Sequence, residues 1–135
     1  MELQVGVKIL LRNKEGKYLT ICRSAEKYPD AGRQWEIAGG RINPGISLME
    51  NLKREVMEET GLEITGEPKL ITAQDIFRSG KDRHIVRLTY IGEASGEVKL
   101  SDEHTEHQWL SLEEMSKLEP IDQFLKEVLN KFDLK

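Results

Sequence analysis

Residues 39–62 decide the fold of this chain, and they read GGRINPGISLMENLKREVMEETGL. Ser47 and Glu50 stand three positions apart before an apolar periodic stretch, which is the capping-box pattern of a helix start. Gly61 supplies the matching stop, because glycine adopts the left-handed conformation that commonly ends a helix. The stretch therefore predicts a helix over 47–60.

One face of this predicted helix is apolar. Leu48, Leu52 and Val56 recur every four residues, and Met49 lies beside them. Residues at this spacing share one side of a helix, so we expect them to form a buried stripe.

The segments on both sides of the helix have the character of strands. Runs of aliphatic and β-branched residues predict strands over 3–11, 17–23, 35–38, 69–77, 84–91 and 106–110. The turn-forming residues 13–16 and 78–82 are expected to close two hairpins, and Gly39-Gly40 is expected to end the third strand as a turn. The two hairpins predict antiparallel strand pairs within the sheet.

The tail from Ile121 predicts a terminal amphipathic helix. Its apolar residues follow the helical period: Phe124, Leu125, Val128, Leu129 and Phe132. Strand pairs interrupted by one helix and closed by another indicate the α+β class, or a three-layer sandwich with a mixed sheet. We expect a single domain over residues 1–135.

Composition excludes several classes of protein. The 135 residues include 33% charged residues, one cysteine and a net charge of −4, which predicts a compact soluble domain without a disulfide scaffold. No basic cluster stands free of acids, so we expect no polymeric nucleic acid as a partner. Residues 1–11 lack a signal-peptide core and no run is long enough to span a membrane, so we expect a cytoplasmic location.

Three acidic residues on the predicted helix point to metal chemistry. Glu55, Glu58 and Glu59 lie at positions i, i+3 and i+4, so their carboxylates converge along one margin of the apolar stripe. Like charges at this spacing repel one another, and a divalent cation would reverse that cost. Oxygen ligands favour Mg²⁺, with Mn²⁺ as a substitute, whereas the simpler alternative is a solvated acidic face.

The surroundings of these acids resemble the Nudix hydrolase family, whose box reads G-x5-E-x7-R-E-U-x-E-E-x-G-U with U aliphatic. Eight of the nine defined positions agree: Gly40, Arg54, Glu55, Val56, Glu58, Glu59, Gly61 and Leu62. The exception is Ile46, which stands where the family has its first box glutamate. The resemblance covers nearly the whole chain and is closest to the MutT-like branch.

The resemblance implies an α/β/α sandwich with a mixed sheet and a central catalytic helix. It also implies Mg²⁺-dependent hydrolysis of a nucleoside diphosphate linked to another moiety, with the metal held by the Gly39 carbonyl, Glu55, Glu58 and Glu59. Arg54 would orient the acids, and either Glu55 or Glu103 would act as the base. For Glu103 the alternative is one ordinary acid in a polar run.

On the substrate side, the resemblance places Arg23, Gly40 and Trp35 at the nucleotide. Arg23 matches a phosphate-contacting arginine, and Trp35 is expected either to stack on a base or to lie in the sheet core. Because signatures of other branches are missing, a nucleoside or deoxynucleoside triphosphate is the expected substrate. Leu118 stands where a base-reading asparagine occurs in relatives that select oxidised guanine, and Asp122 or Gln123 could substitute.

Ile46 opens a second interpretation, namely a nucleotide-binding or regulatory domain with little or no turnover. Its apolar side chain leaves Arg54 without the family's glutamate, although Glu50 lies four residues before Arg54 and could pair with it. His104 and His107 follow Glu103, but a short exposed loop without cysteine does not favour zinc. The expected state is a monomer or a homodimer.

Overall fold

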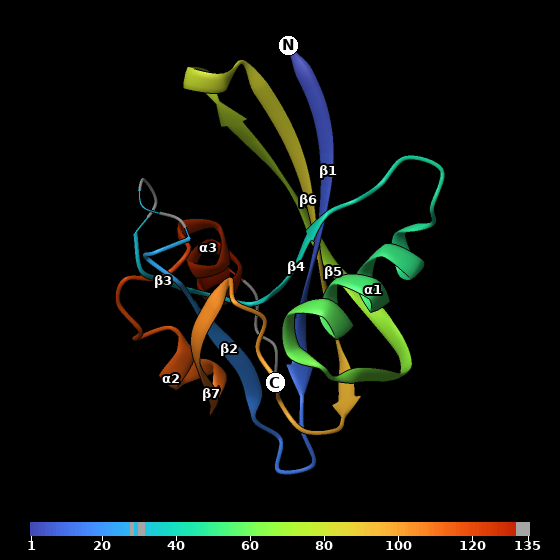
Figure 1. Ribbon diagram of the computed structural model, residues 1–135, viewed down its shortest axis with the longest axis vertical. Coiled ribbons are helices and arrows are strands. Elements are labelled where there is room, and N and C mark those ends of the chain that lie inside the picture. Colours follow the sequence, from blue (N-terminus) through green and yellow to red (C-terminus); the bar gives the residue numbers. More distant parts are fainter. Residues whose placement is uncertain (28, 30–31, 132–135) are drawn as a thin grey trace.

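The computed structural model describes residues 1–27, 29 and 32–131 (Figure 1). Along the chain the elements are β1 (Glu2–Arg12), β2 (Tyr18–Arg23), β3 (Gln34–Glu36), β4 (Ala38–Arg41), α1 (Leu48–Thr60), β5 (Glu63–Arg78), the 3-10 turn η1 (Ser79–Lys81), β6 (Arg83–Ser95), β7 (His104–Leu110), α2 (Leu112–Met115) and α3 (Gln123–Lys131).

The strands form one mixed sheet in the order β3-β2-β1-β6-β5, with β4 pairing β1 and β7 pairing β2. Strands β1 and β6 run parallel from Glu2↔Arg83 to Arg12↔Glu93, and the other named strand pairs are antiparallel. The predicted α+β class with a mixed sheet is therefore confirmed.

Helices cover both faces of the sheet, with α1 on one side and α2 and α3 on the other (Figure 1). Because side chains alternate along a strand, β1 supplies both cores. Val7, Ile9 and Leu11 pack with Leu52 of α1. Leu10 packs on the other side, in a cluster with Tyr18, Ile37, Met115 and Leu125.

The first predicted hairpin is confirmed at its turn but not along its length. The Asn13 side chain accepts hydrogen bonds from the backbone N–H groups of Glu15 and Lys17, at 3.0 and 2.9 Å. Strands β1 and β2 then pair at Arg12↔Tyr18 and separate, because β4 occupies the neighbouring edge of β1. The second hairpin, β5 with β6, forms and is longer than expected at both strands.

Helix α1 has the predicted limits. The Ser47 hydroxyl accepts a hydrogen bond from the Glu50 N–H, and Gly61 ends the helix with φ 72°. Leu48, however, is 37% exposed, so its predicted place in the buried stripe is wrong. Four residues advance about 400° around a helix, so residues spaced by four rotate about 40° per step away from the face that meets the sheet. In the first turn Met49, and not Leu48, packs against the core.

Gly39 and Gly40 form part of strand β4 and not the turn that the sequence predicted. Glycine permits this strand to approach its neighbours closely. At Gly39, φ is 139° and a Cβ would overlap the carbonyl oxygen of Val7 on β1. Gly39 therefore marks a close approach of strands β4 and β1, which local sequence cannot distinguish from a turn.

The predicted terminal helix is confirmed as α3, with Leu125 and Val128 buried, whereas Phe132 lies outside the described residues. The Asp122 side chain caps α3 by accepting hydrogen bonds from the backbone N–H groups of Phe124 and Leu125, at 2.8 and 3.2 Å. Of the helices in the described part of the chain, none combines the length and apolar character that crossing a membrane requires.

Candidate active site

The most buried acid of α1 is Glu59, in the last turn of the helix. It is 7% exposed, and its Oε1 accepts a hydrogen bond of 2.8 Å from the backbone N–H of Gly39 on β4. Burial raises the pKa of Glu59 to about 7, although the Lys8 charge and the Gly39 N–H both act to lower it. A buried carboxylate of this kind is costly as a bare anion and suits a cation.

Glu55 lies one turn earlier, against Gly40. A Cβ on Gly40 would lie 2.7 Å from Oε2 of Glu55, so the missing side chain makes room for the carboxylate. The Glu55 side chain is 16% exposed, and burial raises its pKa while Arg54 opposes the shift. Each glycine of β4 thus positions one glutamate of α1: Gly39 positions Glu59, and Gly40 positions Glu55.

Arg54 links the acids to the start of the helix. Its Nη1 lies 3.1 Å from Oε1 of Glu55 and 3.4 Å from Oε2 of Glu58, which is itself 59% exposed. Its Nη2 donates to Oδ1 of Asn51 at 3.0 Å. The pairing of Arg54 with Glu50 that the sequence spacing allowed is not among these bonds, and within the described residues Arg54 Nε is buried without a partner.

Asn51 is a site residue that sequence reasoning missed. It is fully buried, and its Oδ1 also accepts the N–H of Asn43 at 2.9 Å. Its Nδ2 donates to the carbonyls of Ile46 and Ser47 at 2.9 and 2.7 Å. Asn51 therefore holds the loop that carries Ile46 and supports Arg54. The sequence offered one signal for this role: Asn51 places a polar amide next to Leu52, on the apolar side of the predicted helix.

The loop before β7 brings Glu103 to the same place. The Ser101 N–H donates to the carbonyl of Glu59 at 3.2 Å, and the Ser24 N–H donates to the carbonyl of Glu103 at 2.8 Å. One ligand atom from each of Glu59, Glu103 and His104 lies within 4.8 Å of the others. Acids 44 positions apart in sequence thus meet in one cluster.

Behind this cluster lies a buried carboxylate, Glu36 of β3. It accepts hydrogen bonds from Lys8 at 3.5 Å, from Arg23 at 2.8 Å and from Nε2 of His104 at 2.8 Å. Burial alone would raise the pKa of Glu36, but these three donors hold it well below its ordinary value. Arg23, predicted to contact phosphate, is thus anchored at the site by Glu36.

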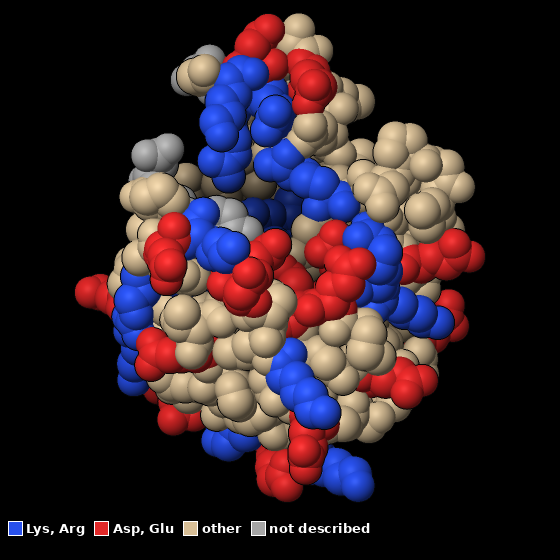
Figure 2. All heavy atoms as spheres, viewed as in Figure 1, with Lys and Arg blue, Asp and Glu red and all other residues tan. Residues whose placement is uncertain are grey.

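A basic pocket of about 360 Å³ adjoins the acids. Its lining consists of Arg23, Gln34, Arg78, Arg87, Ile121, Asp122, Gln123 and Phe124. Figure 2 shows Lys and Arg side chains gathered around a hollow in the upper half of this face, with Asp and Glu side chains along its lower margin. The pKa of Arg41 is lowered first by burial and then by the nearby positive charges of Arg83, Arg78 and Arg87. Such a concentration of cations favours an anionic ligand.

Trp35 lies in β3 and is 4% exposed. The Arg33 guanidinium lies over its ring, 5.6 Å from the centroid, and its backbone forms a bridge with Ile121. The structure thus places Trp35 in the sheet core, between the pocket residues Gln34 and Ile121 that it adjoins, and its contact with a base stays a prediction.

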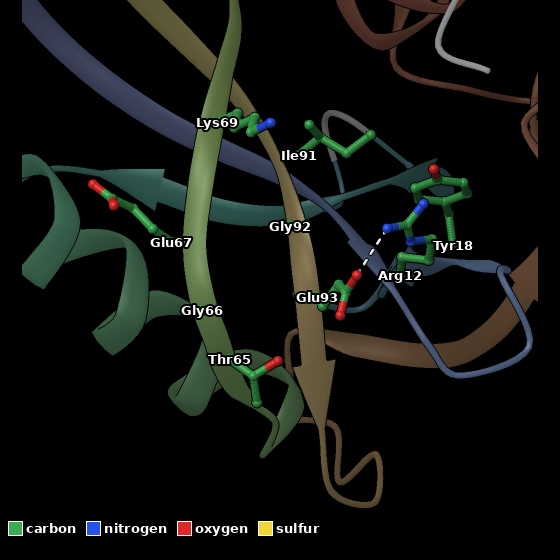
Figure 3. A pocket seen from close by; sticks show the side chains of 9 residues that line it. All are labelled: Arg12, Tyr18, Thr65, Gly66, Glu67, Lys69, Ile91, Gly92 and Glu93. Carbon is green, nitrogen blue, oxygen red and sulfur yellow. Dashed lines mark hydrogen bonds and ion pairs between the residues drawn. The ribbon is translucent and has the colours of Figure 1, made fainter.

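A second hollow, of about 560 Å³, lies around the β5–β6 ribbon and the end of β1 (Figure 3). Its wall includes the ion pair between Arg12 and Glu93, at 2.8 Å. None of the predicted site residues lines it. The acidic cluster and the basic pocket therefore remain the candidate site.

Comparison with known proteins agrees with this geometry. The family model of the NUDIX domain matches residues 2–132. The chain belongs to the Nudix family. As a Nudix hydrolase of the MutT-like kind, it is an enzyme of the nucleotide pyrophosphohydrolase class, as the box residues predicted.

Individual Nudix relatives are moderately similar to the chain. It is 30% identical over 115 residues to nucleoside triphosphatase NudI of Escherichia coli, an alignment that covers 78% of this chain and 80% of NudI. The crystal structure of a MutT protein from Methanosarcina mazei matches with a TM-score of 0.84 at 30% identity, covering 98% of this chain and 94% of that one. A mutator MutT protein from Bacillus halodurans matches with a TM-score of 0.74 at 25% identity, covering 94% and 80%.

Proposed function

We propose that this Nudix enzyme hydrolyses a nucleoside or deoxynucleoside triphosphate to the monophosphate and pyrophosphate, in a reaction that depends on Mg²⁺. The observation that carries the proposal is the adjacency of an acidic cluster, formed by α1 and the loop before β7, to a basic pocket. A polyphosphate bound with a divalent cation needs both: carboxylates for the cation and arginines for the phosphate oxygens. The NudI relative is itself named as a nucleoside triphosphatase.

The donor set fits such a cation. Glu55, Glu58 and Glu59, with Glu103 and the Gly39 carbonyl, would hold Mg²⁺, or Mn²⁺ in its place. The fit rests on the burial of Glu59 and on its raised pKa, because a nearby cation would offset the cost of its charge. When bound, the metal would neutralise the pyrophosphate and lower the pKa of an attacking water.

The chain's own residues have separate tasks. Arg54 holds the carboxylates of Glu55 and Glu58 in place, and Arg23 and Arg87 neutralise phosphate oxygens in the pocket. Water attacks phosphorus, the bond to the leaving pyrophosphate breaks, and a carboxylate accepts the proton of the water. That carboxylate is either Glu55 or Glu103.

The base of the nucleotide would meet the first turn of α3. Of the two candidates for reading it, Asp122 is engaged by Arg87 at 2.9 Å and by the helix cap. Gln123 is exposed and lines the pocket beside Phe124. We therefore assign base contact to the amide of Gln123, which can both donate and accept hydrogen bonds.

The alternative is a nucleotide-binding domain with weak turnover. The observation that favours it is the buried Nε of Arg54, which has no partner among the described residues in a chain that carries Ile46 in place of the box glutamate. An incompletely held Arg54 would leave the acids less well oriented.

The test is release of pyrophosphate and phosphate from a panel of nucleoside triphosphates, with Mg²⁺, with Mn²⁺ and with chelator. Glu58→Gln changes an exposed site acid, and Glu63→Gln changes an exposed glutamate just beyond α1 as its control. Metal-dependent turnover that Glu58→Gln abolishes and Glu63→Gln retains supports the enzyme. Nucleotide binding without turnover in the wild type supports the binding domain.

Two further variants separate the candidate bases. Glu55→Gln and Glu103→Gln are compared for kcat and for nucleotide affinity in the presence of Mg²⁺. Loss of the base lowers kcat by about 10²–10⁴-fold while nucleotide still binds. The variant with the larger fall in kcat at saturating Mg²⁺ and nucleotide identifies the proton acceptor, because saturation removes the effect of weaker metal binding.

A further inference from the structure

His104 is the first residue of β7, and the proposed reaction assigns no role to its ring nitrogen Nδ1. Its side chain is 1% exposed, and Nε2 lies 2.8 Å from Oε2 of Glu36. Lys8 and Arg23 keep Glu36 ionised, so this carboxylate can only accept a hydrogen bond and Nε2 must carry the hydrogen. Nδ1 is buried and makes no hydrogen bond to any described residue.

The fold buries His104 although the sequence suggested an exposed loop. His104 pairs with Arg23 across β7 and β2, where the register shifts between Cys22 and Arg23. The adjacent Ser24 N–H holds the carbonyl of Glu103 at 2.8 Å. The expected exposure of this loop, one of the two reasons against a histidine ligand, therefore does not apply.

The surroundings of this histidine are those of a metal ligand. A ligand atom of His104 lies within 4.8 Å of one from Glu59 and one from Glu103. Histidines that bind metals commonly donate their other ring N–H to a carboxylate, which fixes the ring and its tautomer. Glu36 occupies that place on His104.

We propose that Nδ1 of His104 binds a divalent cation together with the carboxylates of Glu59 and Glu103, and that Glu36 positions the imidazole. The inference rests on the proposed function for the presence of a cation at this cluster, and adds a nitrogen ligand to the carboxylates. A nitrogen donor strengthens binding of ions such as Co²⁺ or Zn²⁺ relative to Mg²⁺, which prefers oxygen.

The competing arrangement is a protonated His104 that donates Nδ1–H directly to Glu59 or Glu103. It would satisfy the same buried nitrogen without any bond between nitrogen and metal. The two arrangements differ in one observable, which is magnetic coupling between the histidine nitrogen and a bound paramagnetic ion.

The experiment uses Mn²⁺ alone as the probe, with the full, untagged chain. Pulsed electron paramagnetic resonance is recorded on protein with ¹⁴N-histidine and with ¹⁵N-histidine. The chain has three histidines, so the double variant His84→Gln/His107→Gln retains His104 alone and leaves the site unchanged. We expect strong histidine nitrogen coupling in the wild type and in this double variant.

His104→Gln should lose the coupling and bind Mn²⁺ at least about tenfold more weakly, with His107→Gln, an exposed position on the same strand, unchanged. Circular dichroism checks that each variant is folded, and the double variant carries the test if His104→Gln is not. Mn²⁺ binding without nitrogen coupling overturns the histidine ligand and leaves the proposed function standing. Absence of any Mn²⁺ binding overturns both.

Discussion

The side chain of Glu59 on helix α1 accepts a 2.8 Å hydrogen bond from the backbone N–H of Gly39 on strand β4. This bond joins the end of the helix to a strand that glycine alone allows to pass so close to β1. The most buried acid of helix α1 is therefore positioned by backbone and not by another flexible side chain, which favours a preformed geometry.

Glu59→Gln should stabilise the metal-free protein at high pH. Burial raises the pKa of Glu59 from 4.5 to about 7, so the folded state holds the proton more tightly than the unfolded state. The free energy of unfolding is therefore highest below about pH 4.5 and falls as the pH rises to about 7, where the folded protein must carry a buried charge. A neutral glutamine keeps the Gly39 bond without that loss. Urea unfolding with chelator should show a gain of about 1–3 kcal/mol at pH 8 and little difference at pH 4.5. Identical unfolding curves at pH 8 would contradict a buried, anionic Glu59.

Gly40→Ala should impair activity more than stability. The new Cβ would lie 2.7 Å from Oε2 of Glu55, so the carboxylate must move. A misplacement of this size is expected to lower kcat by about 10²-fold. Gly80→Ala, where a Cβ meets nothing within 4 Å, is the matched control. Unchanged kcat in Gly40→Ala would mean that the position of Glu55 is not critical.

Ile46→Glu should raise activity. The Nε of Arg54 is buried without a partner among the described residues, and the restored carboxylate would supply an acceptor and a compensating charge. We expect kcat to rise by about tenfold, equivalent to about 1.4 kcal/mol of transition-state stabilisation. Ile46→Gln, of similar size but uncharged, should give a smaller gain. If neither variant moves kcat, Asn51 already provides sufficient support for Arg54.

Asn51→Ala should lower both stability and activity. The substitution leaves the Asn43 N–H and the Ile46 carbonyl without their bonds to the buried amide and removes an acceptor from Arg54. Thermal and urea unfolding should show a loss of about 1–3 kcal/mol, and kcat should fall in parallel. Asn130→Ala, on the exposed face of α3, is the control and should change neither. Full stability in Asn51→Ala would rule out the anchoring role.

Prediction from the sequence succeeded where neighbouring positions interact. The cap at Ser47, the stop at Gly61 and the acids of α1 involve residues within a few positions of one another, and helical geometry alone converts that spacing into a shared face. The same argument failed for Leu48, because the direction of the sheet relative to the helix decides which part of the apolar stripe is covered.

The sequence by itself determined the family, helix α1 and the acids that lie along it, because these depend on residue identity and short spacing. The tertiary structure alone decided that Gly39 and Gly40 lie in a strand, that Asn51 accepts a hydrogen bond from Arg54, and that Glu36 reaches His104. These contacts depend on the separation of the two backbones that carry them. That separation is set by strand pairing and packing between residues distant in the chain, and no local pattern records it.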